Sequence, residues 1–524
     1  MARERGFLNM AGKARNADSA QPAPAARRRR GGTILLAGSM LAASLCAAAV
    51  AASALALGPG IPAQWKPLME FPNAQGRLGV ATTGAMVDVK THPFFAPIGA
   101  NGRACATCHN PADAMSVSLP TIRAEWAARG ARSPLFAAYD GSNCPSLPQE
   151  KESSHSLLLE RGVFRIARLW PPRDVAGKPI EPEFNIKVMS DPTGCNLDGT
   201  YGLNSADPQI SVFRRPRMVA NLRYILVPFH ENNTKTMAPL DRDPETGEHV
   251  SMSIMSDARN PSLRHQMREA SWTHMEMTQG LSERQMQEIE DFEKRVYVAQ
   301  NYSREAGSLL NGPKALGVLA MRDGKHHVNG NDRDTGVFFT FEEWTPKPGT
   351  QPRTEQEAFR ASVARGNDIF FNRAFWINEV VGMNNIRVGN PYKQTCAFCH
   401  NTQMTGHDDV PGWMDLGTQN FPLATPAPDL PVFEITCKPT AAPHPYLGRR
   451  IYTNDPGRAL VSGKCIDVGG IVMQQFRGMA ARAPYLSNGA AKTIREVVDF
   501  YDRRFNIGFT EQEKVDLTNF LGVL

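Results

Sequence analysis

The sequence predicts a mainly α fold, in which two helical lobes follow one another along the chain and long loops are inserted between the helices. Three observations support this prediction. Apolar residues recur at helical spacing behind capping residues, and alternating strand patterns are sparse. A Cys-x-x-Cys-His motif occurs once in each half of the chain, at residues 105–109 and 396–400. The two motifs therefore suggest one equivalent site in each lobe.

Helices are expected over residues 119–128, from Leu263 to Ala270, and at four places where Ser or Thr precedes Glu or Gln by three residues. Such a pair is typical of a capped helix start. The four pairs are Ser282–Gln285, Thr354–Glu357, Thr493–Glu496 and Thr510–Glu513. The helix that begins after Ser282 is expected to run through Val296. Residues 58–100 are expected to be irregular, and residues 410–470 are Pro-rich.

Composition shifts divide the chain into the following predicted parts. They are a signal peptide at 1–56, a first lobe at 57–301 with an inserted segment at about 130–210, a linker at 302–352, and a second lobe at 353–524.

The positive charge is concentrated at the start of the chain. Residues 1–56 contain eight Lys/Arg and two Asp/Glu, which gives +6, the net charge of the whole chain, so the remainder sums to zero. This balance gives no support to nucleic-acid binding. The basic run 27–30 precedes an apolar run with Ala-x-Ala cleavage sites, as in export signals. We expect a periplasmic protein, with membrane attachment only if the signal remains uncleaved.

The cysteines outside the two motifs are even in number once Cys46, inside the apolar run, is set aside. Cys144, Cys195, Cys437 and Cys465 remain, and an even remainder in an exported chain predicts two disulfides. The pairing that joins sequence neighbours is Cys144–Cys195 with Cys437–Cys465. The other two pairings stay open, as does the alternative of four buried thiols.

The two Cys-x-x-Cys-His motifs predict two covalently attached haem c groups. In this motif both thiols add to the porphyrin vinyl groups, and the histidine that follows becomes a ligand of the iron. The six residues are Cys105, Cys108 and His109 in the first motif, and Cys396, Cys399 and His400 in the second. Zinc is the alternative, but neither motif belongs to a compact four-ligand spacing.

Three blocks of the chain resemble the bacterial di-haem cytochrome c peroxidase superfamily, which includes the MauG-type enzymes. The first block is the pair of motifs, one in each lobe. The second is Gln266 followed ten residues later by Glu276-Met277. The third is the segment 482–489 with the helix-like segment 493–501 after it. The resemblance implies two cytochrome c-like lobes.

The resemblance also implies roles for single residues. His109 would be the iron ligand in the peroxide-reactive lobe, and His400 the ligand in the electron-relay lobe. Glu276 would move a proton as the peroxide O–O bond breaks, and Gln266 would help to hold the pocket. A solvated surface glutamate is the plainer interpretation of Glu276.

Tyr501 would be the second ligand of the relay iron. A tyrosine ligand is found in MauG-type members, where ordinary peroxidases have methionine. An anionic phenolate stabilises higher oxidation states of iron. The competing ligands are His407, Met473 and Met479, and an ordinary core tyrosine is the alternative.

Departures from the family pattern also lead to expectations. Ala206 lies where these peroxidases place a histidine over the reactive haem, so that haem would be open unless His155 reaches it. Ser256 replaces the tryptophan between the haems, and Trp272 is a nearby substitute. Arg214 replaces an Asn ligand of the family's calcium ion. Because a guanidinium cannot bind a cation, we expect no calcium there.

Together these features predict an exported di-haem c oxidoreductase of the peroxidase type that uses hydrogen peroxide. Its electron donor would be a small cytochrome or cupredoxin, or an organic or protein substrate oxidised at the surface. Two alternatives stay open. One is an oxygenase similar to the di-haem rubber oxygenases, and the other is a di-haem electron carrier without catalytic activity.

Overall fold

The computed structural model describes residues 60–84, 86–174, 177–226, 242–248, 250–310, 316–324, 341, 343–382, 390–400, 404–407 and 412–524. Residues Ala56–Leu524 belong to one compact unit. The predicted signal peptide and much of the predicted linker therefore lie outside the described residues. Within the described part, no helix combines the length and the apolar character that crossing a membrane requires.

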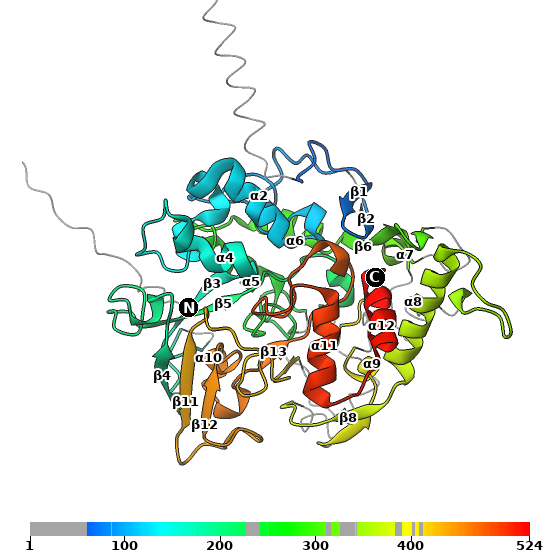
Figure 1. Ribbon diagram of the computed structural model, residues 1–524. Helices are drawn as coiled ribbons and strands as arrows, with labels where there is room; N and C mark the ends of the chain where they lie inside the picture. Colours follow the sequence, from blue (N-terminus) through cyan, green and yellow to red (C-terminus); the bar gives the residue numbers. More distant parts are fainter. Residues whose placement is uncertain are drawn as a thin grey trace, which may run out of the picture. The chain divides into compact units, whose positions relative to one another are not determined.

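The fold is mixed α/β, so the prediction of a mainly α fold is wrong. Helix accounts for 31% and strand for 19% of the structure, and the strands form several small antiparallel sheets rather than a single large one (Figure 1). The strands are two to eight residues long. Such short segments, several of them buried on both faces, show little of the alternation by which a strand is recognised in a sequence.

The largest sheet joins the start of the first lobe to its end. Its order is β1 (Leu68–Asn73), β2 (Gly76–Thr82), β6 (Val296–Ser303) and β7 (Gly307–Ser308). All residues of β6 except Tyr302 are buried. The expected continuation of the preceding helix through Val296 is wrong, because that helix ends at Glu293 and a buried strand follows.

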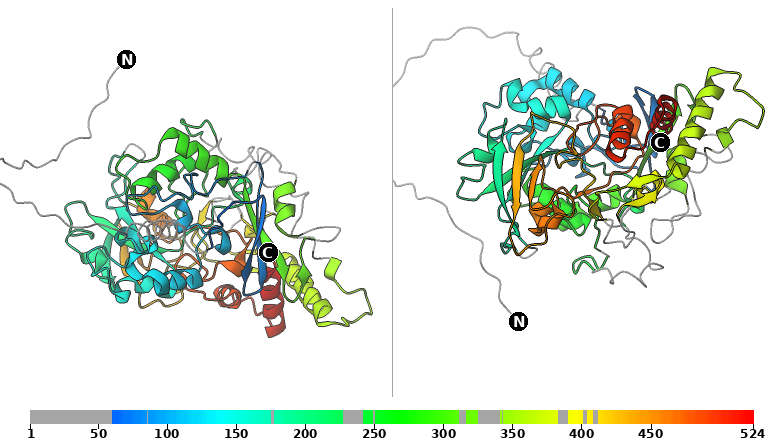
Figure 2. Two further views of the ribbon diagram at one scale, coloured as in Figure 1. Left: turned by 90° about the horizontal axis from the view of Figure 1, so that it is seen from above. Right: turned by 60° about the horizontal axis from the view of Figure 1, so that its bottom comes forward.

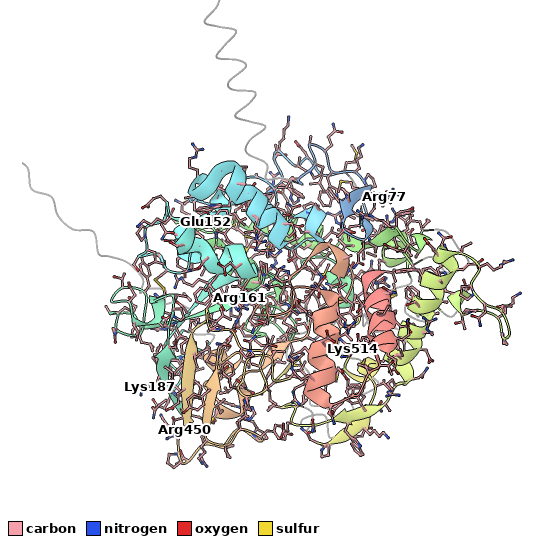
Figure 3. All side chains as sticks on the ribbon, viewed as in Figure 1. Arg77, Glu152, Arg161, Lys187, Arg450 and Lys514 are labelled. Atoms are coloured by element: carbon pink, nitrogen blue, oxygen red, sulfur yellow. A yellow bond between two sulfur atoms is a disulfide. The ribbon has the colours of Figure 1, made fainter. Side chains whose placement is uncertain are left out.

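Two further sheets contain strands of the segment 130–210. β3 (Phe164–Leu169) pairs with β5 (Gln209–Arg214), and β4 (Phe184–Ser190) pairs with β11 (Val432–Cys437) in the order β12-β11-β4. Strand β12 spans Arg450–Thr453. The exposed Lys187 of β4 and Arg450 of β12 are labelled in Figure 3. The inserted segment is therefore joined by hydrogen bonds to residues of the predicted second lobe.

The remaining strand pairs lie close in sequence to the second motif or to its cavity. They are β8 (Phe375–Ile377) with β9 (Tyr392–Gln394), and β10 (Trp413–Met414) with β13 (Ile471–Val472). Strand β9 ends at Gln394, two residues before Cys396. The β8–β9 pair therefore supports the chain as it enters the second motif.

The helix starts predicted from capping pairs are confirmed. Ser282 and Thr510 each form a full capping box, and the Thr354 and Thr493 side chains accept hydrogen bonds from the backbone amides of Glu357 and Glu496. The helices are α2 (Leu119–Arg129), α3 (Ala138–Gly141), α4 (Ser156–Arg161), α5 (Leu263–Trp272), α6 (Glu283–Glu293), α7 (Val318–Asp323), α8 (Glu355–Asn372), α9 (Cys396–Cys399), α10 (Ala459–Ser462), α11 (Ile494–Phe505) and α12 (Glu511–Gly522).

Helices α8 and α12 pack side by side, as both views of Figure 2 show. A Cβ atom at Gly366 would lie 2.1 Å from the carbonyl oxygen of Asp516, so only glycine permits this approach. The buried Asp516 carboxylate accepts from the Ser362 hydroxyl at 2.6 Å and from the Arg365 guanidinium at 2.7 Å. The contact fixes α12 against the helix that leads to the second motif.

Both predicted disulfides are confirmed. Cys144 pairs with Cys195 and Cys437 pairs with Cys465, with Cα–Cα distances of 5.2 and 5.8 Å. The four cysteines of the two motifs take part in neither bond.

Candidate functional site

A cavity of about 180 Å³, which we call cavity 1, opens beside the first motif. Cys105, Cys108 and His109 all line it. The short turn Cys105–Thr107 sets the two thiols on the same wall as the imidazole. The remaining wall is largely apolar, with side chains such as Leu263 and Met267. The motif is therefore arranged around a space rather than packed into the core.

The His109 imidazole is held in one tautomer. Its Nδ1 atom lies 3.1 Å from the carbonyl oxygen of Met115, and since a carbonyl only accepts, Nδ1 carries the proton. Burial lowers the pKa of His109 to about 4, with a further lowering by His274. The ring is therefore neutral, and Nε2 is the nitrogen that can bind a metal.

The two predicted polar residues of the reactive site lie in different surroundings. Gln266, on α5, lines cavity 1. Glu276 is exposed, has a backbone φ of 48°, and accepts a hydrogen bond from Asn101 at 2.9 Å. Its side chain does not belong to the cavity wall. The structure therefore brings Gln266 to His109 and leaves Glu276 at the surface.

Sequence reasoning missed His274, which lines cavity 1 and has a carboxylate behind it. Its Nδ1 atom lies 2.5 Å from Oδ2 of the buried Asp140. Asp140 also forms an ion pair with the buried Arg103. Although burial alone would raise the pKa of Asp140, Arg103 and His274 hold it below its ordinary value. The carboxylate is thus charged and fixes the imidazole.

Glu293, the last residue of α6, also lines cavity 1. Its side chain is 4% exposed, and its Oε2 atom has no hydrogen-bond partner within the described part of the chain. Burial, together with the nearby Glu290 carboxylate, raises the pKa of Glu293 to about 8. This carboxyl is therefore protonated at neutral pH.

A second cavity of about 120 Å³, cavity 2, has His400 and Tyr501 on its wall together. The His400 Nδ1 atom donates to the carbonyl oxygen of Gly406 at 2.8 Å, and Phe476 packs against the ring at a tilt of 33°, with a centroid distance of 4.4 Å. Burial lowers the pKa of His400 to about 4. The same arrangement as at His109 thus leaves Nε2 of a neutral imidazole to bind a metal.

Tyr501 lies on the buried side of α11, and its two methionine competitors, Met473 and Met479, line the same cavity. His407 does not line it; its Nε2 atom lies 2.9 Å from the Ser253 hydroxyl. Burial raises the pKa of Tyr501, so its hydroxyl remains protonated unless a cation binds it.

The two cavities share part of their walls. The shared residues are Arg215, Pro216, Gln474 and Gln475.

Three guanidinium groups, of Arg215, Arg217 and Arg482, line one or both cavities, and within the described residues they bond to carbonyl oxygens, not to carboxylates. Burial lowers the pKa of each to about 10. Buried cations are costly without a counter-charge, so the walls are suited to anionic ligands such as haem propionates.

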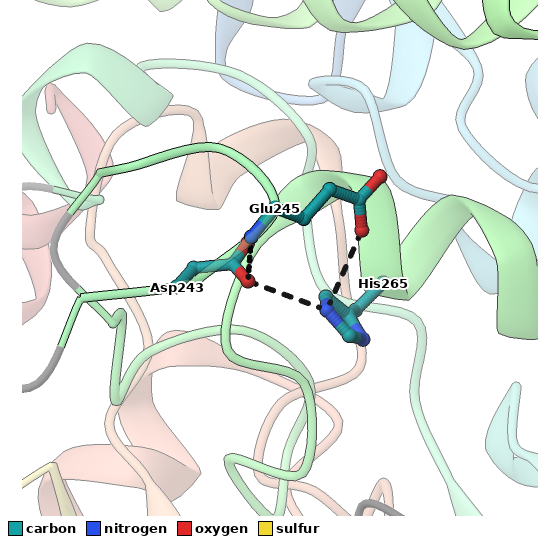
Figure 4. A group of neighbouring side chains, drawn as sticks. All are labelled: Asp243, Glu245 and His265. Carbon is teal, nitrogen blue, oxygen red and sulfur yellow. Dashed lines mark hydrogen bonds and ion pairs between the residues drawn. The ribbon is translucent and has the colours of Figure 1, made fainter. Parts of the chain in front are cut away.

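All three candidate ligand residues of the first motif line cavity 1, and His400 of the second motif lines cavity 2; both cavities are mostly apolar and have arginine side chains on their walls. Among the described residues, the group of three clustered metal-binding side chains is Asp243, Glu245 and His265 (Figure 4), and it contains no residue of either motif.

That acidic group has ordinary partners. Glu245 pairs with Arg268, and Asp243 accepts from the backbone amide of Glu245 at 3.2 Å and from the Thr246 hydroxyl at 3.1 Å. We assign no ligand to it.

The departures from the family pattern have plain structural counterparts. Arg214 lies between two buried carboxylates, Asp257 and Asp455, to which its nitrogens bond at 2.5 and 2.6 Å. His155 is buried, and its two ring nitrogens lie 2.7 and 2.8 Å from the carbonyl oxygens of Gly141 and Gln149. It does not line cavity 1.

Ala206 and Trp272 are both exposed, Trp272 to 53%, whereas Ser256 lines cavity 1. Trp272 is therefore in no position to bridge the two cavities.

Comparisons with models of known protein families, with curated proteins and with solved structures give no match. The resemblance to the di-haem peroxidases therefore rests on sequence motifs alone.

Proposed function

We propose that this protein is an exported di-haem c-type oxidoreductase that reduces hydrogen peroxide with electrons from a donor. One observation supports this above the others. The first motif lines cavity 1 with Cys105, Cys108 and His109, the second lines cavity 2 with His400, and in each motif the histidine donates through Nδ1 to a backbone carbonyl. A fixed Nδ1 proton leaves Nε2 for the iron, as in other histidine-ligated metal sites.

The residues that would hold the cofactors are those of the motifs. Cys105 and Cys108 would form the thioether bonds in cavity 1 and His109 would bind iron. Cys396, Cys399 and His400 would do the same for the second haem. When bound, the haems supply iron that exchanges single electrons and, in cavity 1, a site for peroxide.

The protein's own residues would set the surroundings of these groups. Arg215, Arg217 and Arg482 would neutralise propionates and thereby recover the cost of their own burial. Gln266 would orient a bound peroxide or water through its amide. Tyr501, which lines cavity 2 together with His400, would be a further ligand there and so leave peroxide binding to cavity 1.

The haem count tests the proposal directly. The exported protein, produced together with a cytochrome c maturation system, should contain two haems by pyridine haemochrome analysis. Replacement of Cys105 and Cys108 by alanine should remove one haem, and so should replacement of Cys396 and Cys399. The matched control replaces Cys144 and Cys195 and should remove none. Fewer than two haems in the wild-type protein would refute the proposal.

The ferric optical spectrum then separates the proposal from its rivals. A high-spin component that responds to peroxide supports the peroxidase. Two low-spin haems indifferent to peroxide would make the protein an electron carrier. Oxygen consumption with an organic substrate and without peroxide would make it an oxygenase similar to the rubber oxygenases.

A further inference from the structure

We propose that His274, oriented by Asp140, is the residue that moves the proton during peroxide cleavage in cavity 1. This inference rests on the proposed function, and it assigns to His274 the role that the sequence pattern predicts for Glu276. It follows from the position of the two side chains in the cavity and at the surface.

The contact with Asp140 orients the His274 imidazole. The Asp140 carboxylate is 2% exposed, and it lies 2.5 Å from Nδ1 of His274 and within an ion pair to Arg103. A carboxylate accepts, so Nδ1 holds the proton and the lone pair is on Nε2. Since a carboxylate behind an imidazole both fixes its tautomer and stabilises its charged form, His274 is prepared to act as a base.

Hydrogen bonds also fix the backbone of the segment that bears His274. Its carbonyl oxygen accepts from Asn101 Nδ2 at 2.9 Å and from Arg103 Nη1 at 3.0 Å. The next carbonyl, of Met275, accepts from the Ala100 amide at 2.9 Å. The segment 100–103, which precedes the first motif, therefore holds His274 at a fixed position relative to Cys105. A catalytic base needs such a position.

The His274 side chain has access to cavity 1. His274 shares the wall of cavity 1 with His109 and Gln266, and its side chain is 30% exposed. Glu276 lies two residues further along but is exposed and bonded to Asn101. A proton-transferring group must reach the reacting oxygens directly or through one water, and of the two side chains only His274 lines the cavity.

Nε2 of His274 accepts the proton of one peroxide oxygen and returns it to the other, which leaves as water when the O–O bond breaks. His274 ends in its starting protonation state. Over a full turnover, one hydrogen peroxide takes two electrons from a one-electron donor protein and two protons from solvent, and yields two waters.

The test compares His274→Leu and His274→Gln with the wild-type holoprotein. The glutamine keeps a hydrogen bond to Asp140 but cannot act as a base, so it guards against loss of folding. The matched control is His265→Gln on α5, outside the cavity wall. Two rates are measured: the reaction with peroxide, and the binding of cyanide to the ferric protein. Hydrogen cyanide must lose its proton to bind as an anion, so this binding reports the base without turnover.

We expect both His274 variants to retain two haems and to react with peroxide roughly 10²- to 10⁴-fold more slowly, the usual contribution of a general acid–base group. Cyanide binding should slow roughly 10-fold or more for the same reason. His265→Gln should change neither rate.

Unchanged rates in both His274 variants would overturn this inference and leave the proposed function standing. Loss of both rates in Glu276→Gln, with His274→Gln unaffected, would return the role to Glu276. A wild-type protein that lacks two haems would overturn the proposed function together with the role of His274.

Discussion

The guanidinium of Arg214 forms a two-point contact with the carboxylate of Asp455, at 2.6 and 2.9 Å, across 241 residues of sequence. Its third nitrogen bonds to Asp257 at 2.5 Å. All three side chains are at most 2% exposed. This buried group joins the end of β5 to the segment that follows β12, and so it fixes the two predicted lobes to one another near cavity 1.

Replacement of Arg214 by methionine should lower the free energy of unfolding by about 3–5 kcal/mol, because the buried Asp455 carboxylate loses its cationic partner and Asp257 retains only Arg259. The midpoint of urea denaturation measures this change. The matched control, Lys187→Met, alters an exposed side chain and should change stability by less than about 0.5 kcal/mol. Equal midpoints for the two variants would contradict the assigned role of Arg214.

Glu293 predicts a pH dependence of stability. Its folded-state pKa, about 8, lies above the ordinary value, so the native state binds the proton more tightly than the unfolded chain does. Its contribution is therefore fully present below about pH 4.5 and is lost as the pH rises to about 8. Thermal unfolding of the wild-type protein should thus fall in temperature over this window.

In Glu293→Gln, the neutral amide removes the titration. The variant should nearly match the wild-type protein near pH 5 and exceed it near pH 9 by on the order of 5 kcal/mol, the free-energy equivalent of the shift in pKa. A wild-type advantage that grows with pH would show that Glu293 is ionised in the folded protein and has a partner there.

Local signals predicted the parts of the structure that short segments determine. The capping pair at Ser282 starts α6 as expected, and Cys144 pairs with Cys195. The strand β6 escaped prediction because it is buried on both faces and begins three residues after the last residue of α6. An unbroken apolar run is equally consistent with helix or strand.

The candidate site divides in the same way. The motif cysteines and histidines are contiguous in sequence, and the pattern alone identifies them. The contact between His274 and Asp140 joins residues 134 apart, and nothing local to either residue signals it. Glu276 fits a sequence pattern, but the backbone at this residue turns the side chain toward Asn101 at the surface.

The disulfide Cys144–Cys195 closes a longer loop than Cys437–Cys465, with sequence separations of 51 and 28 residues. Loop-closure entropy of the unfolded chain then predicts a loss of about 4 kcal/mol when Cys144 and Cys195 are both changed to serine, and slightly less for the other pair. Denaturation midpoints of the two double variants measure the difference.

The matched experiment is reduction of the wild-type protein. Dithiothreitol should lower its stability by the sum of the two effects while the haem count remains at two, since thioether bonds resist thiol reductants. Stability that dithiothreitol leaves unaltered would mean that neither pair is bonded in solution.

Tyr501 and His400 line the same cavity, which makes Tyr501 the candidate for the second ligand of the relay haem. Tyr501→Phe removes only the hydroxyl, so the protein should fold and retain two haems while the optical spectrum of one haem changes. The matched control is Tyr452→Phe on β12, an exposed tyrosine that lines neither cavity, and it should leave both spectra unaltered.

Because burial raises the pKa of Tyr501, the phenolate would form only when ferric iron offsets that cost. Reduction to ferrous iron should therefore weaken the bond and alter the same haem. If the ferric spectrum of Tyr501→Phe equals that of the wild-type protein, Tyr501 is not the ligand. The spectra of Met473→Leu and Met479→Leu then show whether either methionine is the ligand instead.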